Sequence, residues 1–326
     1  MREFELIRRL QEIIRVPDGR HAKRCVLGIG DDAAIFDPPG ESQLVACTDS
    51  LVEGVHFPAG TSPAAIGHKA LAVNLSDLAA MGAEPAWFLL ALTLPRAEPD
   101  WLESFARGMA GLAVESGILL AGGDVASGPL NICVTALGVV EPGQALPRSG
   151  ARPGDLVVVS GRPGGAAHAL QTLELGGVPD VRDLAALEFP QPRLTLGRAL
   201  RGLATACIDI SDGLLADLGH ILEQSGAGAE LELRRLPCPG SLASLPEQQR
   251  WPLQLSGGDD YELCFTVPEP AAGQLDAVAR RTRTELTVIG TITAAVGLVI
   301  REPGGGRYPV GHGGYEHFSG DADPAP

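Results

Sequence analysis

The sequence predicts an α/β protein built from two domains. With 326 residues the chain is too long for one ordinary core. Short apolar runs of strand length alternate with longer segments of helical periodicity, which is the pattern of α/β folds. A stretch rich in proline and glycine, residues 141–154, is the best candidate for a domain boundary. We therefore expect domains at residues 1–142 and 143–320, followed by a disordered tail at residues 321–326.

The first domain is expected to open with an amphipathic helix, because charged and apolar residues alternate at helical spacing over residues 1–10. A long helix should start at Ser62, a favoured N-cap residue, with Pro63 in the first helical position. Gly82 is a natural C-terminal stop for this helix. The other predicted elements of this domain are strands at 24–29, 33–36, 43–48, 86–94 and 131–140 and a helix at 98–117.

The second domain repeats the alternation of strands and helices. Strands are predicted at 155–160, 204–210, 229–233, 263–267, 286–292 and 296–301. Helices are predicted at 164–175, 194–203, 214–225 and 271–283.

Charge and cysteine content narrow the class of protein. A net charge of −15 without a basic stripe argues against nucleic acid as the main partner. The six cysteines are far apart and form no C-x-x-C pair, so they are expected to be core residues in a reducing compartment. The N-terminal segment does not resemble a signal peptide, and no apolar run reaches membrane-spanning length. We expect a cytoplasmic protein without a membrane or nucleic-acid partner.

Carboxylates recur where we expect glycine-rich strand ends. A single Asp beside Gly is usually a turn or a cap. Here the pattern occurs five times, and no Lys or Arg lies between Cys25 and His68 to neutralise the first acids. Such an array indicates an oxygen-ligand site for Mg²⁺. The acids are Asp31 and Asp32, Asp49, Asp124, Asp209 and Asp212, and Asp259 and Asp260, with Asp77 added from a helix.

Several familiar nucleotide and catalytic motifs are missing from the sequence. There is no P-loop and no protein-kinase motif set. Gly28-x-Gly30 superficially matches a dinucleotide fingerprint, but the two acids that follow would repel a pyrophosphate. No convincing His–Asp or Ser–His pair is present, so we expect no general base.

Three single residues leave alternatives open. His56 fits either an ordinary loop histidine or a contact to substrate. Arg148, at the domain boundary, is either a surface arginine or a clamp for a phosphate. Tyr315 either pins the terminal segment or contacts a ligand.

Taken together, these motifs resemble the thiamine-monophosphate kinase family over essentially the whole chain. The resemblance rests on residues 28–33 (GIGDDA), 48–57 (TDSLVEGVHF), 74–83 (NLSDLAAMGA), 121–124 (AGGD), 208–214 (IDISDGL), 256–263 (SGGDDYEL) and 314–318 (GYEHF). It implies an N-terminal α/β domain with a small antiparallel sheet that forms a homodimer. It also implies a C-terminal α/β domain of the aminoimidazole ribonucleotide synthetase type. The implied activity is ATP-dependent phosphorylation of thiamine monophosphate to thiamine diphosphate with several Mg²⁺ ions.

The resemblance also implies residue roles. Metal ligands would be Asp32, Cys47, Thr48, Asp49, Asp77, Asp124, Asp209 and Asp212. ATP would be contacted by Gly123, Asp124, Arg148 and Ser211, and thiamine monophosphate by His56, Asp259 and Tyr315. The sequence departs from the family at Cys47, where a hydroxyl is frequent, and at Asp259, where Glu is usual.

Other readings remain open at this point. Aminoimidazole ribonucleotide synthetase, selenophosphate synthetase and a hydrogenase-maturation protein share this fold and also use ATP on acidic sites. Selenophosphate synthetase would need a reactive residue in an N-terminal glycine-rich stretch, and Cys25 lies in an apolar run. The hydrogenase factor would need a C-terminal cysteine, which residues 321–326 lack. A regulatory module that binds Mg²⁺ or nucleotide is the non-enzymatic alternative.

Overall fold

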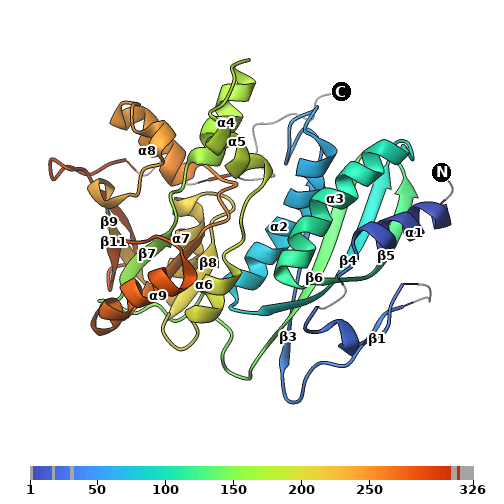
Figure 1. Cartoon of the computed structure of the whole chain (residues 1–326). Helices are drawn as coiled ribbons and strands as arrows, with labels where there is room; N and C mark the ends of the chain where they lie inside the picture. The colour runs from blue at the N-terminus through green and yellow to red at the C-terminus, as the bar shows by residue number, and fades with distance from the viewer. Residues whose placement is uncertain (1–2, 17–18, 30–32, 310–313, 316–326) are drawn as a thin grey trace. The chain divides into compact units, whose positions relative to one another are not determined.

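The computed structural model describes residues 3–16, 19–29, 33–309 and 314–315, and the chain divides into two units. The first unit comprises Met1–Leu146 and Glu188–Gly202, and the second comprises Pro147–Leu187 and Leu203–Pro326 (Figure 1). Each unit is therefore assembled from segments that are separated in the sequence. The expected tail at residues 321–326 lies outside the described residues.

A four-stranded sheet organises the described part of the first unit, with the strand order β3-β6-β4-β5. Neighbouring strands are antiparallel except for β4 and β5, which are parallel. The strands are β1 (Cys25–Leu27), β2 (Ile35–Phe36), β3 (Gln43–Val52), β4 (Glu84–Leu94), β5 (Leu119–Ser127) and β6 (Asn131–Val140). The helices are α1 (Glu3–Ile13), α2 (Pro63–Ala80), α3 (Pro99–Ser116) and α6 (Leu194–Ala199).

Helix α2 begins and ends as its sequence predicts. The Ser62 hydroxyl accepts the N–H of Ala65 at 3.2 Å, and Pro63 occupies the first turn. After the helix, Gly82 adopts a φ of +64°, a left-handed conformation that ends the helix. Helices α2 and α3 pack together, and α2 also contacts β3, β6 and α6 (Figure 1). Because α2 is surrounded on most sides, small alanine side chains suit it.

Asp49 and Asp124 lie within strands, so our prediction that they follow strand ends is wrong. Strand β3 pairs with β6 without interruption from Gln43 to Val52. Strand β5 likewise continues beside β4 to Ser127. Backbone hydrogen bonds extend through these acids because the main-chain groups pair within the sheet, while the side chains project alternately from its two faces. A carboxylate can therefore project from one face without ending the strand.

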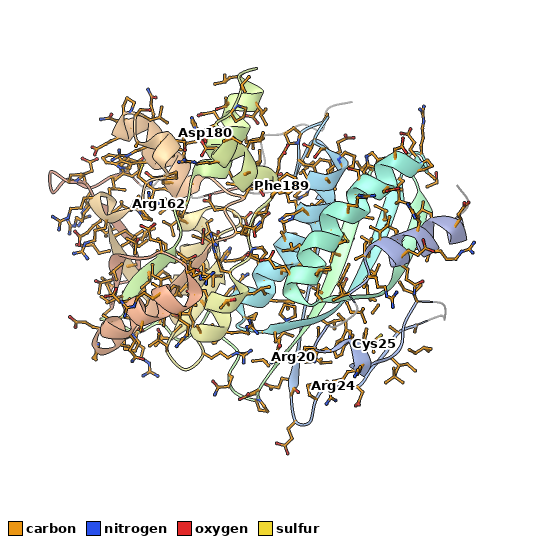
Figure 2. All side chains as sticks on the ribbon, viewed as in Figure 1. Arg20, Arg24, Cys25, Arg162, Asp180 and Phe189 are labelled. Atoms are coloured by element: carbon orange, nitrogen blue, oxygen red, sulfur yellow. The ribbon has the colours of Figure 1, made fainter. Side chains whose placement is uncertain are left out.

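The face of this sheet opposite α2 is partly covered by the segment around β1 and β2. Trp87 stacks on Phe36 with ring centroids 4.6 Å apart, and its indole N–H donates to the carbonyl of His21. Arg20, which is labelled in Figure 2, forms an ion pair with Glu84 at 2.7 Å. We call the remaining face, which carries Leu44 and other exposed β3 side chains, the open face of the sheet.

A six-stranded sheet organises the described part of the second unit, with the strand order β12-β9-β11-β7-β10-β8. Only the β12–β9 pair within this sheet is parallel. The strands are β7 (Leu156–Ser160), β8 (Ala206–Asp209), β9 (Gly228–Glu232), β10 (Leu263–Val267), β11 (Leu286–Thr293) and β12 (Gly297–Arg301). The helices are α4 (Gly165–Glu174), α5 (Val181–Glu188), α7 (Leu214–Ser225), α8 (Glu247–Ser256) and α9 (Leu275–Thr282).

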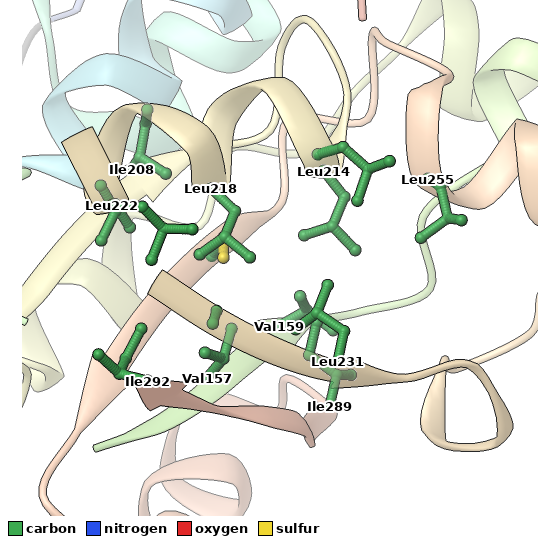
Figure 3. Packing of buried hydrophobic residues seen from close by; sticks show 14 of the residues in the cluster. Val157, Val159, Ile208, Leu214, Leu218, Leu222, Leu231, Leu255, Ile289 and Ile292 are labelled. Carbon is green, nitrogen blue, oxygen red and sulfur yellow. The ribbon is translucent and has the colours of Figure 1, made fainter. Parts of the chain in front are cut away.

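Helix α7 packs on this sheet through one apolar face. Leu214 and Leu218 are buried against Ile208 of β8 and Val157 and Val159 of β7 (Figure 3). Burying side chains of this size stabilises the fold by about 1.5–3 kcal/mol each. This packing fixes the first turn of α7 directly after the carboxyl end of β8, where the acidic residues of the sequence motif lie.

Some elements differ from the prediction. Strand β5 and helices α5 and α8 were not predicted, and α8 contains Pro252, which disfavours a helix interior. The helix predicted at 271–283 is α9 preceded by a 3₁₀ segment, Glu269–Gln274. In the part of the chain that the structure describes, no helix is long and apolar enough to cross a membrane.

Candidate active site

Three predicted ligands of the first unit meet on the helix side of its sheet. Cys47 and Asp49 alternate along β3 and are both half-buried, which places them on the same face. The Cys47 thiol lies 3.4 Å from the carbonyl oxygen of Asn74 on α2 and hydrogen-bonds the Asp77 carboxylate. Burial, followed by the charges of Asp77 and Asp49, raises the pKa of the Cys47 thiol. Cys47 is therefore a neutral thiol between two carboxylates.

The predicted ligand Thr48 projects from the opposite face of β3. Its hydroxyl lies 3.0 Å from the hydroxyl of Thr135 and donates to the carbonyl of Val134 at 3.1 Å. Because consecutive strand residues face opposite sides, the Thr48 hydroxyl is not brought beside the Asp49 carboxylate.

A pocket of about 1080 Å³ lies on the open face of the sheet. Gly123 and Asp124 of β5, Thr135 of β6, and Gly28 and Ile29 all line it. The pocket thus brings together two motifs that are almost a hundred residues apart in the sequence. It is large enough for a ligand of nucleotide size.

Gly123 is required by a close backbone approach beside this pocket. A Cβ atom at this position would lie 1.9 Å from the carbonyl oxygen of Leu90, far inside contact distance. The φ of +150° is a further cost for any other residue. Glycine here lets β5 run close to β4 and holds Asp124 opposite Ala91.

His56 is held in a loop that follows β3. Its Nδ1 accepts the N–H of Val52 at 3.0 Å, so the neutral ring carries its proton on Nε2. The ammonium of Lys69, only 3% exposed, donates to the His56 carbonyl at 2.9 Å. One of the two lysines in the sequence is therefore used to fix the loop that carries His56.

In the second unit, three predicted site residues lie at the end of β8 and in the loop of residues 210–213, which connects β8 to α7. Asp209 ends β8 and is 4% exposed, while Ser211 and Asp212 in the loop are half-buried. The strand end and the loop together thus hold two carboxylates and a hydroxyl within four consecutive positions, 209–212.

Asp217, which the sequence analysis did not select, supports this loop from within. Its Oδ2 accepts backbone N–H groups of Ser211, Asp212 and Gly213 at 3.0, 3.1 and 3.1 Å. Burial and then the charges of Asp209 and Asp212 raise the pKa of Asp217 to about 8. The available signal was an acid on the face of α7 that also carries Leu214, Leu218 and Ile221.

Residues 257–261 form a second loop that adjoins the first. Asp259 and Tyr261 adopt positive φ values of 68° and 50°, which are unusual for residues other than glycine. Between them, Asp260 is half-buried and its carboxylate accepts the N–H of Gly164 at 2.8 Å. The Tyr261 hydroxyl donates to Oδ1 of Asp259 at 2.8 Å.

The last two predicted residues of this unit differ in position. The N–H of Tyr315 donates to the carbonyl of Asp212 at 3.2 Å, and the Tyr315 side chain is 49% exposed. Arg148 is exposed and follows Pro147, whose carbonyl accepts the N–H of Cys207 on the edge strand β8. The structure therefore brings Tyr315 to the 210–213 loop, whereas it places Arg148 beside the edge of the sheet.

Among the described residues, no three or more His, Cys, Asp or Glu side chains form a group that could hold a metal ion. The predicted ligand Asp32 lies outside them. The remaining predicted carboxylates belong either to the first unit (Asp49, Asp77 and Asp124) or to the second (Asp209 and Asp212).

Comparison with known proteins agrees with this two-part architecture. Residues 30–140 match the N-terminal domain of AIR synthase related proteins, and residues 152–301 match the C-terminal domain. The thiamine-monophosphate kinase of Escherichia coli K12 is 46% identical over 301 residues, covering 90% of this chain and 92% of that protein.

Solved structures give the same result. The crystal structure of thiamine-monophosphate kinase from Stenotrophomonas maltophilia K279a has a TM-score of 0.85 and 44% identity, covering 92% of this chain and 96% of that one. The structure of AaThiL complexed with AMPPCP and TMP has a TM-score of 0.76 and 30% identity, covering 85% of this chain and 88% of that one. The motifs, both domains and the full-length similarity lead to one conclusion: the chain belongs to the thiamine-monophosphate kinase family.

Proposed function

We propose that this protein transfers the γ-phosphoryl group of ATP to thiamine monophosphate, forming thiamine diphosphate and ADP. The observation that carries the proposal is 46% identity to a thiamine-monophosphate kinase over both domains. The related AaThiL structure holds AMPPCP, an ATP analogue, together with TMP. The sister enzymes of the same fold are not favoured, because the relatives at 41–46% identity are thiamine-monophosphate kinases.

The chemistry of the acidic residues fits Mg²⁺. In the first unit, the charges of Asp49 and Asp77 both raise the pKa of the Cys47 thiol, so the two carboxylates lie near each other. In the second unit, the charges of Asp209 and Asp212 both raise the pKa of Asp217, so these carboxylates also lie near each other. Carboxylate oxygens are the ligands that Mg²⁺ prefers, completed by water and substrate phosphates. We propose Asp49, Asp77, Asp124, Asp209 and Asp212 as the principal ligands, with Asp32 and Thr48 as further candidates.

Cys47 is the weakest member of the proposed metal set. Its thiol donates toward Asn74 and Asp77, and thiols are soft ligands that suit Mg²⁺ poorly. We therefore assign Cys47 a packing role at this position, beside the two carboxylates.

The proposed transfer needs positioning and charge stabilisation more than acid–base catalysis. The acceptor is a phosphate oxygen of thiamine monophosphate, which is largely ionised at neutral pH because its second pKa is about 6. No general base is therefore required. Bound Mg²⁺ would supply charge neutralisation for the two phosphate groups during in-line transfer.

The residues of this chain supply binding and orientation in the proposed reaction. His56 presents an Nε2–H donor, the polarity that a phosphate oxygen requires. Asp259 offers a negative charge, and the exposed Tyr315 ring a π face, to the cationic thiazolium. We assign Gly123, Asp124, Arg148 and Ser211 to ATP.

We further propose that the open face of the first unit's sheet forms a homodimer interface. Leu44 on β3 is 48% exposed there, and Val26 and Ile35 on β1 and β2 are 66% and 52% exposed. Large apolar side chains that are exposed on several strands of one unit favour a surface that another subunit covers.

A product assay with several acceptors tests the proposed function. Purified protein would receive ATP and Mg²⁺ with thiamine monophosphate, thiamine or an aminoimidazole precursor, each in a separate reaction. We expect thiamine diphosphate and ADP in equal amounts from thiamine monophosphate alone. Turnover with another acceptor, or ADP without thiamine diphosphate, would indicate the activity of another ATP-using enzyme of the same fold.

A further inference from the structure

Asp217 engages every N–H group of residues 211–213 in the loop between β8 and α7. One oxygen, Oδ2, accepts all three N–H groups within 3.0–3.1 Å. The side chain is 2% exposed and belongs to the first turn of α7. Each of these hydrogen bonds gives a backbone N–H group of the loop an acceptor inside the fold. The course of this loop is therefore set by Asp217.

The carbonyl groups of the same loop hold the other segments of the candidate site. The carbonyl oxygens of Ile210 and Ser211 accept the N–H groups of Tyr261 and Asp259, both at 2.8 Å. The carbonyl oxygen of Asp212 accepts the N–H of Tyr315 at 3.2 Å. A single loop thus joins the proposed metal ligands to both proposed substrate contacts of the second unit.

The use of these N–H groups decides which ligand the loop suits. A turn from a strand into a helix can bind a phosphate when its N–H groups have no partner in the protein, aided by the helix dipole. Here Asp217 already accepts these groups, so the turn does not offer them to an anion. What the turn presents is the carboxylates of Asp209 and Asp212, which suit a divalent cation.

We propose that Asp217 is a positioning residue that shapes the 210–213 loop into a divalent-cation site and aligns Asp259 and Tyr315 with it. The inference rests on the proposed function for its assignment of Asp209 and Asp212 as ligands. Asp217 itself touches neither metal nor substrate in this account. It acts through the backbone that carries the residues which do.

The variant Asp217→Asn tests this role, because it keeps the size of the side chain but replaces the carboxyl group with an amide, which has only one acceptor oxygen. Binding of Mn²⁺ alone would be measured by electron paramagnetic resonance on the purified full-length protein without nucleotide. We expect the Mn²⁺ dissociation constant to rise by roughly 10- to 100-fold, as for other partners that orient metal ligands. We also expect the Mg²⁺ concentration for half-maximal turnover to rise.

Asp155→Asn is the matched control. Asp155 is also a buried aspartate of the second unit, 5% exposed, and accepts the N–H of Arg152 at 2.9 Å and the Thr205 hydroxyl at 2.7 Å. Neither of these hydrogen bonds involves the 210–213 loop. We expect this variant to lose stability but to bind Mn²⁺ like the wild type. Equal Mn²⁺ binding by Asp217→Asn and wild type, or equal loss in both variants, would overturn the proposal.

Amide hydrogen exchange on the wild-type protein keeps the proposal testable should Asp217→Asn fail to fold. Without metal, the N–H groups of Ser211, Asp212 and Gly213 should exchange slowly, because Asp217 already binds them. Rapid exchange there would contradict the proposal.

The inference and the proposed function can fail separately: Mn²⁺ binding lost in Asp217→Asn supports the inference whichever acceptor is phosphorylated. Thiamine diphosphate formation with unaltered Mn²⁺ binding in this variant would support the function alone.

Discussion

The hydroxyl of Tyr261 donates a hydrogen bond to Oδ1 of Asp259 at 2.8 Å, and both residues adopt positive φ values. This bond fixes the carboxylate at the position where the family usually has the longer Glu. The strained backbone places the two side chains within reach of each other although only one residue separates them.

Removing this hydroxyl should weaken binding of thiamine monophosphate. In Tyr261→Phe the ring, which is 7% exposed, keeps its packing, but the Asp259 carboxylate loses a donor. We expect KM for thiamine monophosphate to rise roughly tenfold, the effect of one hydrogen bond to a charged group, with KM for ATP unchanged. Steady-state kinetics measure both constants. Tyr308→Phe is the control, since its ring packs edge-on against Trp251 in the same unit. An equal change in KM for thiamine monophosphate and KM for ATP would refute the proposed role of the Tyr261 hydroxyl in binding thiamine monophosphate.

Neutralising either carboxylate beside Cys47 should abolish turnover in a folded protein. Asp49→Asn and Asp77→Asn each remove one negative charge from the proposed metal site while keeping side-chain size. We expect turnover to fall by at least roughly 100-fold at saturating Mg²⁺. Circular dichroism would confirm that each variant is folded. Near-normal turnover in either variant would remove that residue from the metal site.

Cys47→Ser serves as the companion variant and should be tolerated. The thiol contacts Asn74 and Asp77, and a hydroxyl can donate to the same oxygens. We expect turnover near that of the wild type, with an equal or lower Mg²⁺ requirement. A large loss of turnover would show that the thiol has a chemical role of its own.

A charge on the open face of the first unit's sheet should break the proposed dimer. Leu44→Glu puts a carboxylate on exposed β3, where burial against a second subunit would be costly. Leu175→Glu is the control, because Leu175 is 82% exposed and belongs to the second unit. Sedimentation velocity should show a dimer for the wild type and Leu175→Glu and a monomer for Leu44→Glu. A monomeric wild type would contradict the assignment.

The stability of the first unit should fall in mild acid partly through His68. This side chain is 9% exposed, its Nε2 lies 2.8 Å from the carbonyl oxygen of Pro190, and burial lowers its pKa from 6.5. As the pH falls below about 6.5, the unfolded chain therefore binds a proton that the folded chain does not. Protonation then favours unfolding.

His68→Gln keeps an N–H donor but does not titrate, so it isolates this effect. We expect the stability advantage of the wild type over His68→Gln to be smaller at about pH 5.5 than at about pH 7.5. The limit for one proton is about 1.4 kcal/mol per pH unit. Urea unfolding at both pH values gives the two free energies. An advantage that is the same at both would mean that His68 titrates alike in the folded and unfolded chains.

The sequence predicted most elements because their signals are local. Ser62, Pro63 and Gly82 mark the ends of α2 by backbone rules that need no tertiary information. Helix α8 was missed because Pro252 argues against a helix, and packing of Trp251 and Leu255 overrides that local preference.

The parts of the candidate site that escaped prediction depend on contacts between distant segments. Asp49 seemed to end a strand, because side-chain polarity does not reveal that β6 pairs with β3 as far as Val52. Asp217 is a single acid on an apolar helix face, and its role follows only from the three N–H groups of the preceding loop. Tyr261 was part of a recognised motif, but its bond to Asp259 depends on two positive φ values.

Phosphoryl transfer from ATP to thiamine monophosphate is the central claim, and a single-turnover reaction with [γ-³²P]ATP tests it most directly. Excess protein, Mg²⁺ and thiamine monophosphate would be mixed with labelled ATP, stopped at short times and separated. We expect the label to pass directly into the terminal phosphate of thiamine diphosphate, with none bound to the protein. Label on the protein, or label released only as inorganic phosphate, would contradict direct transfer to this acceptor.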